Sequence, residues 1–197
     1  MIIQVPAQTD TQFSQIASNQ CSWAAAEFAL QNSKLRSLLR DGKTEEFQSI
    51  YRSCLEKATH QRAEAGSKHL FGENIDTPEL LDYYKQKNLT VISSYTICKN
   101  EDEEFLKILH PDLLREFYTR TYRTDQSLET ILNQIFNSEC ALVSRHGQSL
   151  AVIYYYGKYL ICDSHLHTAM ILNREDAMSH ILMDHGGHLH LTILLVL

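Results

Sequence analysis

The sequence predicts an α+β domain whose helical amino-terminal part packs on a carboxy-terminal, mostly antiparallel sheet. Apolar residues recur at helical spacing in the first two thirds, whereas from Cys140 onward they form short runs separated by turn signals. Helices followed by a meander of strands are typical of α+β domains. The 197 residues suffice for one sizeable core, and they contain no repeat or linker. We therefore expect a single catalytic domain over residues 1–197.

Two helices are predicted near the amino terminus. The first spans about residues 22–31, a stretch dense in good helix formers and free of Gly and Pro, and it has Cys21 at its first turn. The second opens at Thr44. Its apolar residues repeat at intervals of three and four and therefore share one face, which comprises Phe47, Ile50, Tyr51, Cys54, Leu55 and Ala58.

The middle of the chain predicts two further helices and a strand. Thr77 caps a helix that has Pro78 at its first helical position and extends to about residue 87. Residues 89–96 are β-rich and predict a strand. Residues 101–119 predict a helix with a break at Pro111.

The last third predicts a helix, three strands joined by hairpins, a second helix and a final strand. Asp125 or Ser127 caps the first helix and Asn173 the second, which Gly186 and Gly187 follow. The expected strands cover residues 141–143, 150–155, 159–163 and 188–197.

Composition and charge exclude several classes of partner. The formal net charge of −6 disfavours binding to nucleic acid, which needs a concentrated excess of Lys and Arg. No apolar run reaches the roughly 18 residues that span a bilayer, and the amino terminus does not read as a secretory signal. Five cysteines without a C-x-x-C pair favour a reducing, cytoplasmic compartment, or a host cytosol for a secreted bacterial effector.

Cys21 is the candidate nucleophile. Only the thiolate reacts efficiently, and an ordinary thiol with a pKa near 8.5 is only about 3% ionised at pH 7. The unpaired N–H groups and the dipole of a helix amino terminus favour the anion. The alternative is a small apolar residue buried beneath Trp23.

Asp163 and His165 are the candidate partners of this thiol. Two residues apart on a strand, they would project from one face about 6.6 Å apart, so that the carboxylate could orient the imidazole. The alternative is a solvated strand end at which the two residues merely begin a loop.

These segments resemble the active-site regions of the herpesvirus large-tegument-protein deubiquitinases. The resemblance rests on Ser-Asn-Gln-Cys21-Ser-Trp opening a helix, on Gln8 upstream of it, and on a hairpin whose second strand ends in Asp163-Ser164-His165. Viral members commonly have proline where Ser164 stands. The resemblance covers about the first 30 residues, roughly residues 142–168 and a final apolar strand. Deubiquitinases of this type also occur outside viruses.

The resemblance implies a papain-like cysteine peptidase fold and a function. Cys21 would be the nucleophile, His165 the general base and acid, and Asp163 its orienting residue. Gln8 would donate its side-chain amide to the oxyanion hole, a contribution of typically ~3 kcal/mol. The expected substrate and partner is ubiquitin or a polyubiquitin chain, cleaved after the carboxy-terminal glycine. We expect a monomer that needs no cofactor or metal.

Several alternatives stay open at this point. Gln15, six residues before Cys21, has the spacing at which papain places its oxyanion glutamine. The substrate of such a site could be a non-ubiquitin protein cleaved by a protease or modified by an acyltransferase, and the chain could also be a non-catalytic interaction module. The sequence around Ser149 resembles a serine nucleophile elbow, but a hairpin does not provide the strand-to-helix turn that an elbow needs.

A zinc site would have to use the histidines that cluster late in the chain. The candidate ligands are His165, His167, His188 and His190, with Asp163 or Asp184. Their spacing matches no familiar zinc motif, so we expect no metal.

Overall fold

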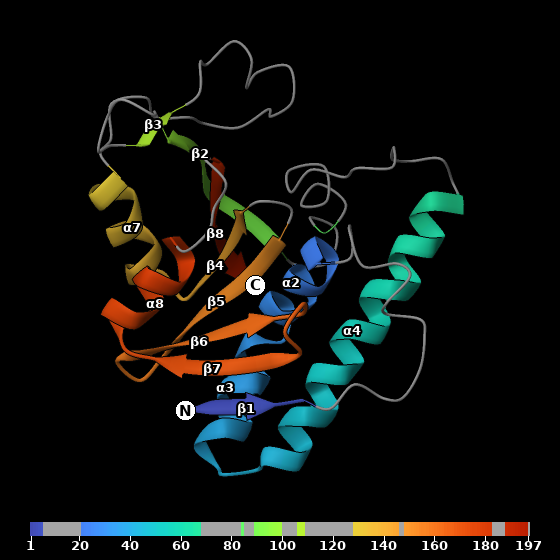
Figure 1. Ribbon diagram of the computed structural model, residues 1–197. Helices are drawn as coiled ribbons and strands as arrows, with labels where there is room; N and C mark the ends of the chain where they lie inside the picture. The colour runs from blue at the N-terminus through green and yellow to red at the C-terminus, as the bar shows by residue number, and fades with distance from the viewer. Residues whose placement is uncertain are drawn as a thin grey trace.

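The computed structural model describes residues 1–5, 21–67, 84, 89–99, 106–108, 128–145, 148–182 and 188–196. Within these residues eight strands form one sheet, and each pair of neighbours is antiparallel (Figure 1). The strand order is β1-β7-β6-β5-β4-β8-β2-β3. The strands are β1 (Ile2–Gln4), β2 (Leu89–Lys99), β3 (Leu106–Ile108), β4 (Cys140–Arg145), β5 (Gln148–Tyr155), β6 (Lys158–Asp163), β7 (Thr168–Leu172) and β8 (His188–Val196).

The centre of the sheet is a meander of four consecutive strands, β4 to β7. Its first hairpin pairs Arg145 with Gln148, as the turn signals predict. The second pairs Tyr155 with Lys158 and turns at Tyr156 and Gly157, both at positive φ, which suits the twist of a two-residue hairpin loop. The final strand β8 lies between β4 and β2, and β1 pairs with β7 at one edge of the sheet.

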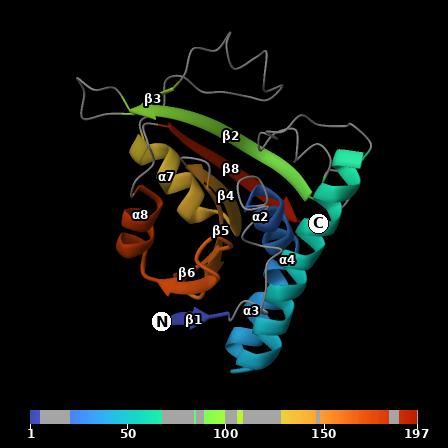
Figure 2. The ribbon, with the colours of Figure 1, turned by 45° about the vertical axis from the view of Figure 1, so that its right-hand side comes forward.

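Helices cover both faces of this sheet. The helices α2 (Cys21–Leu30), α3 (Asn32–Arg40) and α4 (Thr44–Ser67) lie on one face, whereas α7 (Leu128–Asn137) and α8 (Arg174–Leu182) lie on the other (Figures 1 and 2). Side chains therefore alternate between two cores along each central strand. On β6, Leu160 and Cys162 face the first core, and Tyr159 and Ile161 face the second. This two-sided burial explains why these strands read as continuous apolar runs.

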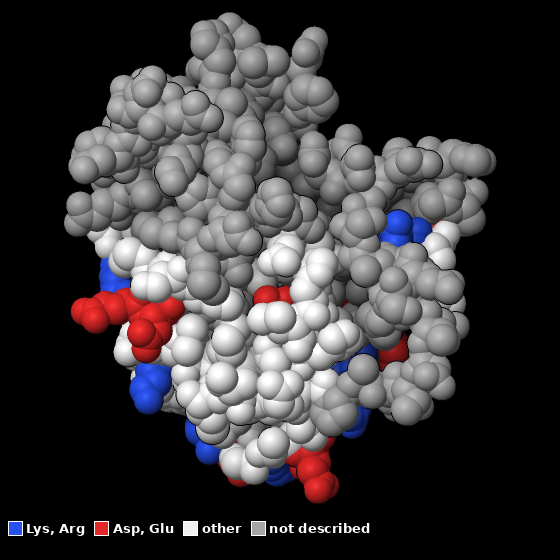
Figure 3. Space-filling view, in the orientation of Figure 1, with Lys and Arg blue, Asp and Glu red and all other residues white. Residues whose placement is uncertain are grey.

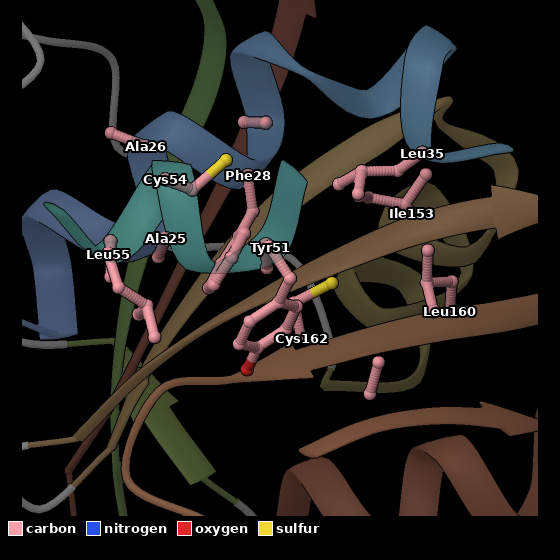
Figure 4. Close-up of a cluster of buried hydrophobic side chains, with 14 of the residues drawn as sticks. Ala25, Ala26, Phe28, Leu35, Tyr51, Cys54, Leu55, Ile153, Leu160 and Cys162 are labelled. Carbon is pink, nitrogen blue, oxygen red and sulfur yellow. The ribbon is translucent and has the colours of Figure 1, made fainter. Parts of the chain in front are cut away.

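Helix α2 is buried on nearly every side because it lies between the sheet and α4. Its alanines allow this close approach, and Phe28 packs against Tyr51 of α4 with 4.4 Å between ring centroids. Figure 4 shows Tyr51 pointing from α4 toward the sheet beside Cys162. The apolar stripe predicted for α4 is confirmed, since its members are buried except Ile50, which is partly buried. Full burial of such a side chain contributes about 1.5–3 kcal/mol, so this packing fixes α2 against the sheet.

One expected helix is wrong at the residues that can be checked. Leu106, Lys107 and Ile108, inside the helix expected over residues 101–119, form β3 and pair with β2. A three-residue edge strand is determined by the backbone groups of its partner rather than by local periodicity. The rest of that helix lies outside the described residues, as does the helix expected over residues 77–87 apart from Tyr84, which is helical.

The other expected elements are present, with small differences at their ends. Asn173 caps α8 as predicted, since its Oδ1 accepts the backbone N–H of Asp176 at 2.8 Å. The short strand β1, the helix α3 and the strand β7 are elements that the sequence did not predict. Among the described helices, none has the length and apolarity needed to cross a bilayer. On the face seen in Figure 3, the charged side chains of the described residues have both signs and lie mainly toward the edge.

Candidate active site

Cys21 is the first residue of α2, and its side chain is buried at the amino terminus of this helix. Helix α2 packs against β5 and β4, the strands at the centre of the sheet. The first backbone N–H groups of a helix have no partner within the helix, and they carry the positive end of its dipole. The position therefore favours a thiolate.

His165 lies in the turn of residues 164–167 that joins β6 to β7. Residues from two other parts of the fold hold this turn. The hydroxyl of Tyr51, from α4, shares its one proton between the carbonyl oxygens of Asp163 at 2.7 Å and Thr168 at 3.1 Å, one at each end of the turn. The backbone N–H of Val5, directly after β1, donates to the carbonyl oxygen of His167 at 2.9 Å. The packing of α4 against the sheet thus also sets the position of His165.

Asp163 is the last residue of β6 and is buried, and its carboxylate acts on the backbone of the turn. Its Oδ1 accepts the N–H of His165 at 2.8 Å and the N–H of Leu166 at 3.3 Å. Their spacing in the sequence predicts that Asp163 and His165 lie on one face of a continuous strand. The strand instead ends at Asp163, because a side chain that accepts the N–H two residues ahead stabilises a turn. Nε2 of His165 is buried and makes no hydrogen bond to any described residue.

The structure brings Cys21 and His165 into hydrogen-bonding contact, although they lie far apart in the sequence. Burial by itself would raise the pKa of the Cys21 thiol. The hydrogen bond and the charge of His165, with two hydrogen bonds from Ser149, outweigh that effect and lower the pKa. In return, the hydrogen bond of Cys21 raises the pKa of His165 against the opposing effect of burial, and the charges of Cys21 and Asp163 add to the rise. Both shifts favour a thiolate–imidazolium pair.

The other described cysteines differ from Cys21 in this respect. Burial raises the pKa of Cys54 to about 12, with a further contribution from the charge of Glu27. Burial likewise raises the pKa of Cys140 to about 12 and that of Cys162 well above its ordinary value. Only the thiolate is an effective nucleophile, so among these four thiols Cys21 is suited to react.

This difference predicts selective alkylation. With iodoacetamide at pH 7, Cys21 should react at least about 10³-fold faster than Cys54, Cys140 or Cys162, because the reactive thiolate fraction falls tenfold for each unit by which the pKa rises. Peptide mass spectrometry of the folded protein at increasing reaction times measures the four rates. Since all four side chains are buried, exposure does not separate them. Equal rates would contradict the assignment.

Ser149 is the residue of this site whose role the sequence did not indicate. The nucleophile-elbow pattern drew attention to it, and the structure places it inside the hairpin strand β5, not at a strand-to-helix turn. It nevertheless contacts the Cys21 sulfur through both its backbone N–H and its hydroxyl. Its role depends on how α2 packs on β5, which no local pattern reports.

Several of the remaining candidate residues lie outside the part of the chain that the structure describes. Gln8 and Gln15 both lie there, so the choice between them as oxyanion donor stays a prediction. The same holds for Asp184 and for the side chains of His188 and His190 in the zinc alternative. Among the described side chains, no group of three His, Cys, Asp or Glu is placed to hold a metal ion.

Comparison with known proteins shows a likeness of fold to a solved structure. No protein-family model matches the sequence, and no curated protein matches it either. Among solved structures, the chain is similar to the ubiquitin-specific protease encoded by the tegument protein M48 of murine cytomegalovirus, which was solved in complex with a ubiquitin-based suicide substrate. The TM-score is 0.62 at 10% sequence identity, over 98% of this chain and 84% of the viral one. The predicted α+β fold is thus confirmed, and it is the fold of this viral ubiquitin-specific protease.

Proposed function

We propose that this protein is a cysteine deubiquitinase that hydrolyses the isopeptide bond after the carboxy-terminal glycine of ubiquitin. The observation that carries the proposal is the hydrogen-bonded pair of Cys21 and His165, with the pKa of the thiol lowered and that of the imidazole raised. The fold shared with a ubiquitin-specific protease supports the substrate class. A non-catalytic binding module, by contrast, has no need of a thiol activated in this way.

In the first half of the reaction, the Cys21 thiolate attacks the carbonyl carbon of the terminal glycine. The oxygen of that carbonyl becomes an oxyanion, which the backbone N–H of Cys21 stabilises together with the side-chain amide of Gln8 or Gln15. The His165 imidazolium then donates its proton to the lysine amine. The C–N bond breaks, the amine leaves, and ubiquitin remains bound to Cys21 as a thioester.

In the second half, neutral His165 accepts a proton from a water molecule as that water attacks the thioester carbonyl. The C–S bond breaks, releasing ubiquitin with a free carboxylate and restoring the thiolate–imidazolium pair. Asp163 contributes by fixing the backbone that carries His165 and by favouring the charged imidazole. Binding of the ubiquitin body would hold the scissile bond at the sulfur, and such positioning lowers the barrier.

A ubiquitin carrying a carboxy-terminal propargylamide tests this proposal. The wild-type protein should form a covalent adduct that gains the mass of one probe in intact mass spectrometry. Cys21→Ala should form none, because the attacking sulfur is missing. Cys140→Ala is the matched control, since it removes a buried thiol outside the site and should leave labelling unchanged.

Two outcomes would contradict the proposal in different ways. Labelling that persists in Cys21→Ala would show that another residue is the nucleophile. If a general thiol reagent modifies Cys21 while the ubiquitin probe does not, the site would belong to a protease or acyltransferase with a different substrate. A truncated probe without the two terminal glycines is the negative control and should not label the wild-type protein.

A further inference from the structure

A buried hydroxyl cluster lies directly against the start of α2. Ser149 is only 4% exposed, and its Oγ lies 2.8 Å from Oγ of Ser22, the second residue of α2. It also lies 2.7 Å from Oγ of Ser144, its cross-strand partner on β4. The same hydroxyl contacts the sulfur of Cys21. A single buried hydroxyl therefore has three hydrogen-bonding neighbours.

The capacity of a hydroxyl group determines how these bonds can be shared. A serine hydroxyl donates one hydrogen bond and accepts two. A thiolate can only accept, so when Cys21 is ionised the one proton of Ser149 goes to the sulfur. Ser149 can then accept from both Ser22 and Ser144, and its full capacity is used. A neutral thiol is a weak acceptor, so the same arrangement stabilises the uncharged form less.

We propose that Ser149 is a positioning residue that donates its hydroxyl proton to the Cys21 thiolate while accepting hydrogen bonds from Ser22 and Ser144. The cluster holds a preorganised donor at the sulfur, and its backbone N–H adds a second. This inference rests on the proposed function, because it takes Cys21 as the nucleophile. It goes beyond that function by adding a second source of thiolate stabilisation, on β5, independent of His165.

The charged groups near the Cys21 thiol do not mask the effect of Ser149 on that thiol. Among the described residues, His165 in the β6–β7 turn is the titratable group that acts directly on Cys21. The charge of Asp163 acts in turn on His165. Glu27, on the same helix, faces Tyr84 and acts on Cys54 instead. Changes at Ser149 should therefore be readable as changes in the titration of Cys21 alone.

The test is the pH dependence of Cys21 alkylation by iodoacetamide in Ser149→Ala. Loss of the hydroxyl should raise the midpoint of the rate profile by about one pH unit, so the rate below both midpoints should fall about tenfold. Ser149→Thr keeps the hydroxyl and should restore the wild-type midpoint. Ser138→Ala is the matched control: it removes a partly buried hydroxyl that bonds to Ile135, away from Cys21, and should leave the midpoint unchanged.

An unchanged midpoint in folded Ser149→Ala would overturn the inference, and so would the same shift in Ser138→Ala. If circular dichroism shows that Ser149→Ala does not fold, Ser22→Ala decides, since it removes a group that polarises Ser149. A smaller rise in its midpoint supports the inference, and no rise overturns it. Alkylation needs no ubiquitin. A wild type that the ubiquitin probe fails to label, with a shifted midpoint in Ser149→Ala, would refute only the proposed function.

Discussion

Replacing His165 by alanine is expected to lower ubiquitin hydrolysis by about 10⁴-fold, the upper range for loss of a general acid–base. Two effects combine. Without the hydrogen bond and charge of His165, burial dominates the Cys21 environment, so the thiol pKa rises and the sulfur is protonated at neutral pH. No imidazolium is then left to protonate the departing lysine amine. The measurement is kcat/KM for ubiquitin bearing a fluorogenic carboxy-terminal amide, taken as a function of pH.

The pH profile separates this explanation from a loss of folding. In the wild type, activity should rise through the lowered pKa of Cys21 and fall again above the ordinary imidazole pKa, because the pKa of His165 is raised. In His165→Ala the residual activity should keep rising beyond the ordinary thiol pKa. His60→Ala, at an exposed position of α4, is the matched histidine control and should retain wild-type rates. A loss of less than about tenfold in His165→Ala would remove this residue from the mechanism.

The sequence evidence for the two residues of the pair is local. A cysteine that opens an Ala-rich helix and an Asp-x-His at the end of a short strand are visible without a structure. The fold follows for a similar reason, since the periodicities of α4, α7 and the meander differ clearly. The order of strands does not follow in this way. That β8 lies between β4 and β2 depends on contacts between distant segments, and so does the short strand β3.

Two features of the site could not be predicted from the sequence, for the same physical reason. Ser149 acts on Cys21 only because the β4–β5 register brings Ser144 beside it and α2 packs on the same strands. The hydrogen bonds of Asp163 depend on where β6 stops, and the end of a strand is set by its partner strands as much as by its own residues. A spacing of two residues indicates one face only if the strand continues through both.

Asp163 offers the second large effect, and the structure predicts a ranking of two variants. In Asp163→Ala the backbone N–H groups of His165 and Leu166 lose their acceptor in a partly buried turn, which costs about 1–3 kcal/mol for an unsatisfied buried group. The turn that carries the imidazole then loses its fixed position. We expect kcat/KM to fall by about 10²-fold, the scale on which misplacement of a catalytic group reduces rates.

Asp163→Asn should be much less damaging, because its Oδ1 can accept the same two backbone N–H groups. It removes the negative charge, so the pKa of His165 should fall and the alkaline limb of the pH profile should move to lower pH. We expect kcat/KM at the optimum to stay within about tenfold of wild type, since only the charge term is lost. A carboxylate that acted mainly by bonding the imidazole ring would instead give equal losses in the two variants. Asparagine would then favour the wrong tautomer and lose as much activity as alanine. Equal losses in the two variants would therefore contradict the role that the backbone hydrogen bonds assign to Asp163.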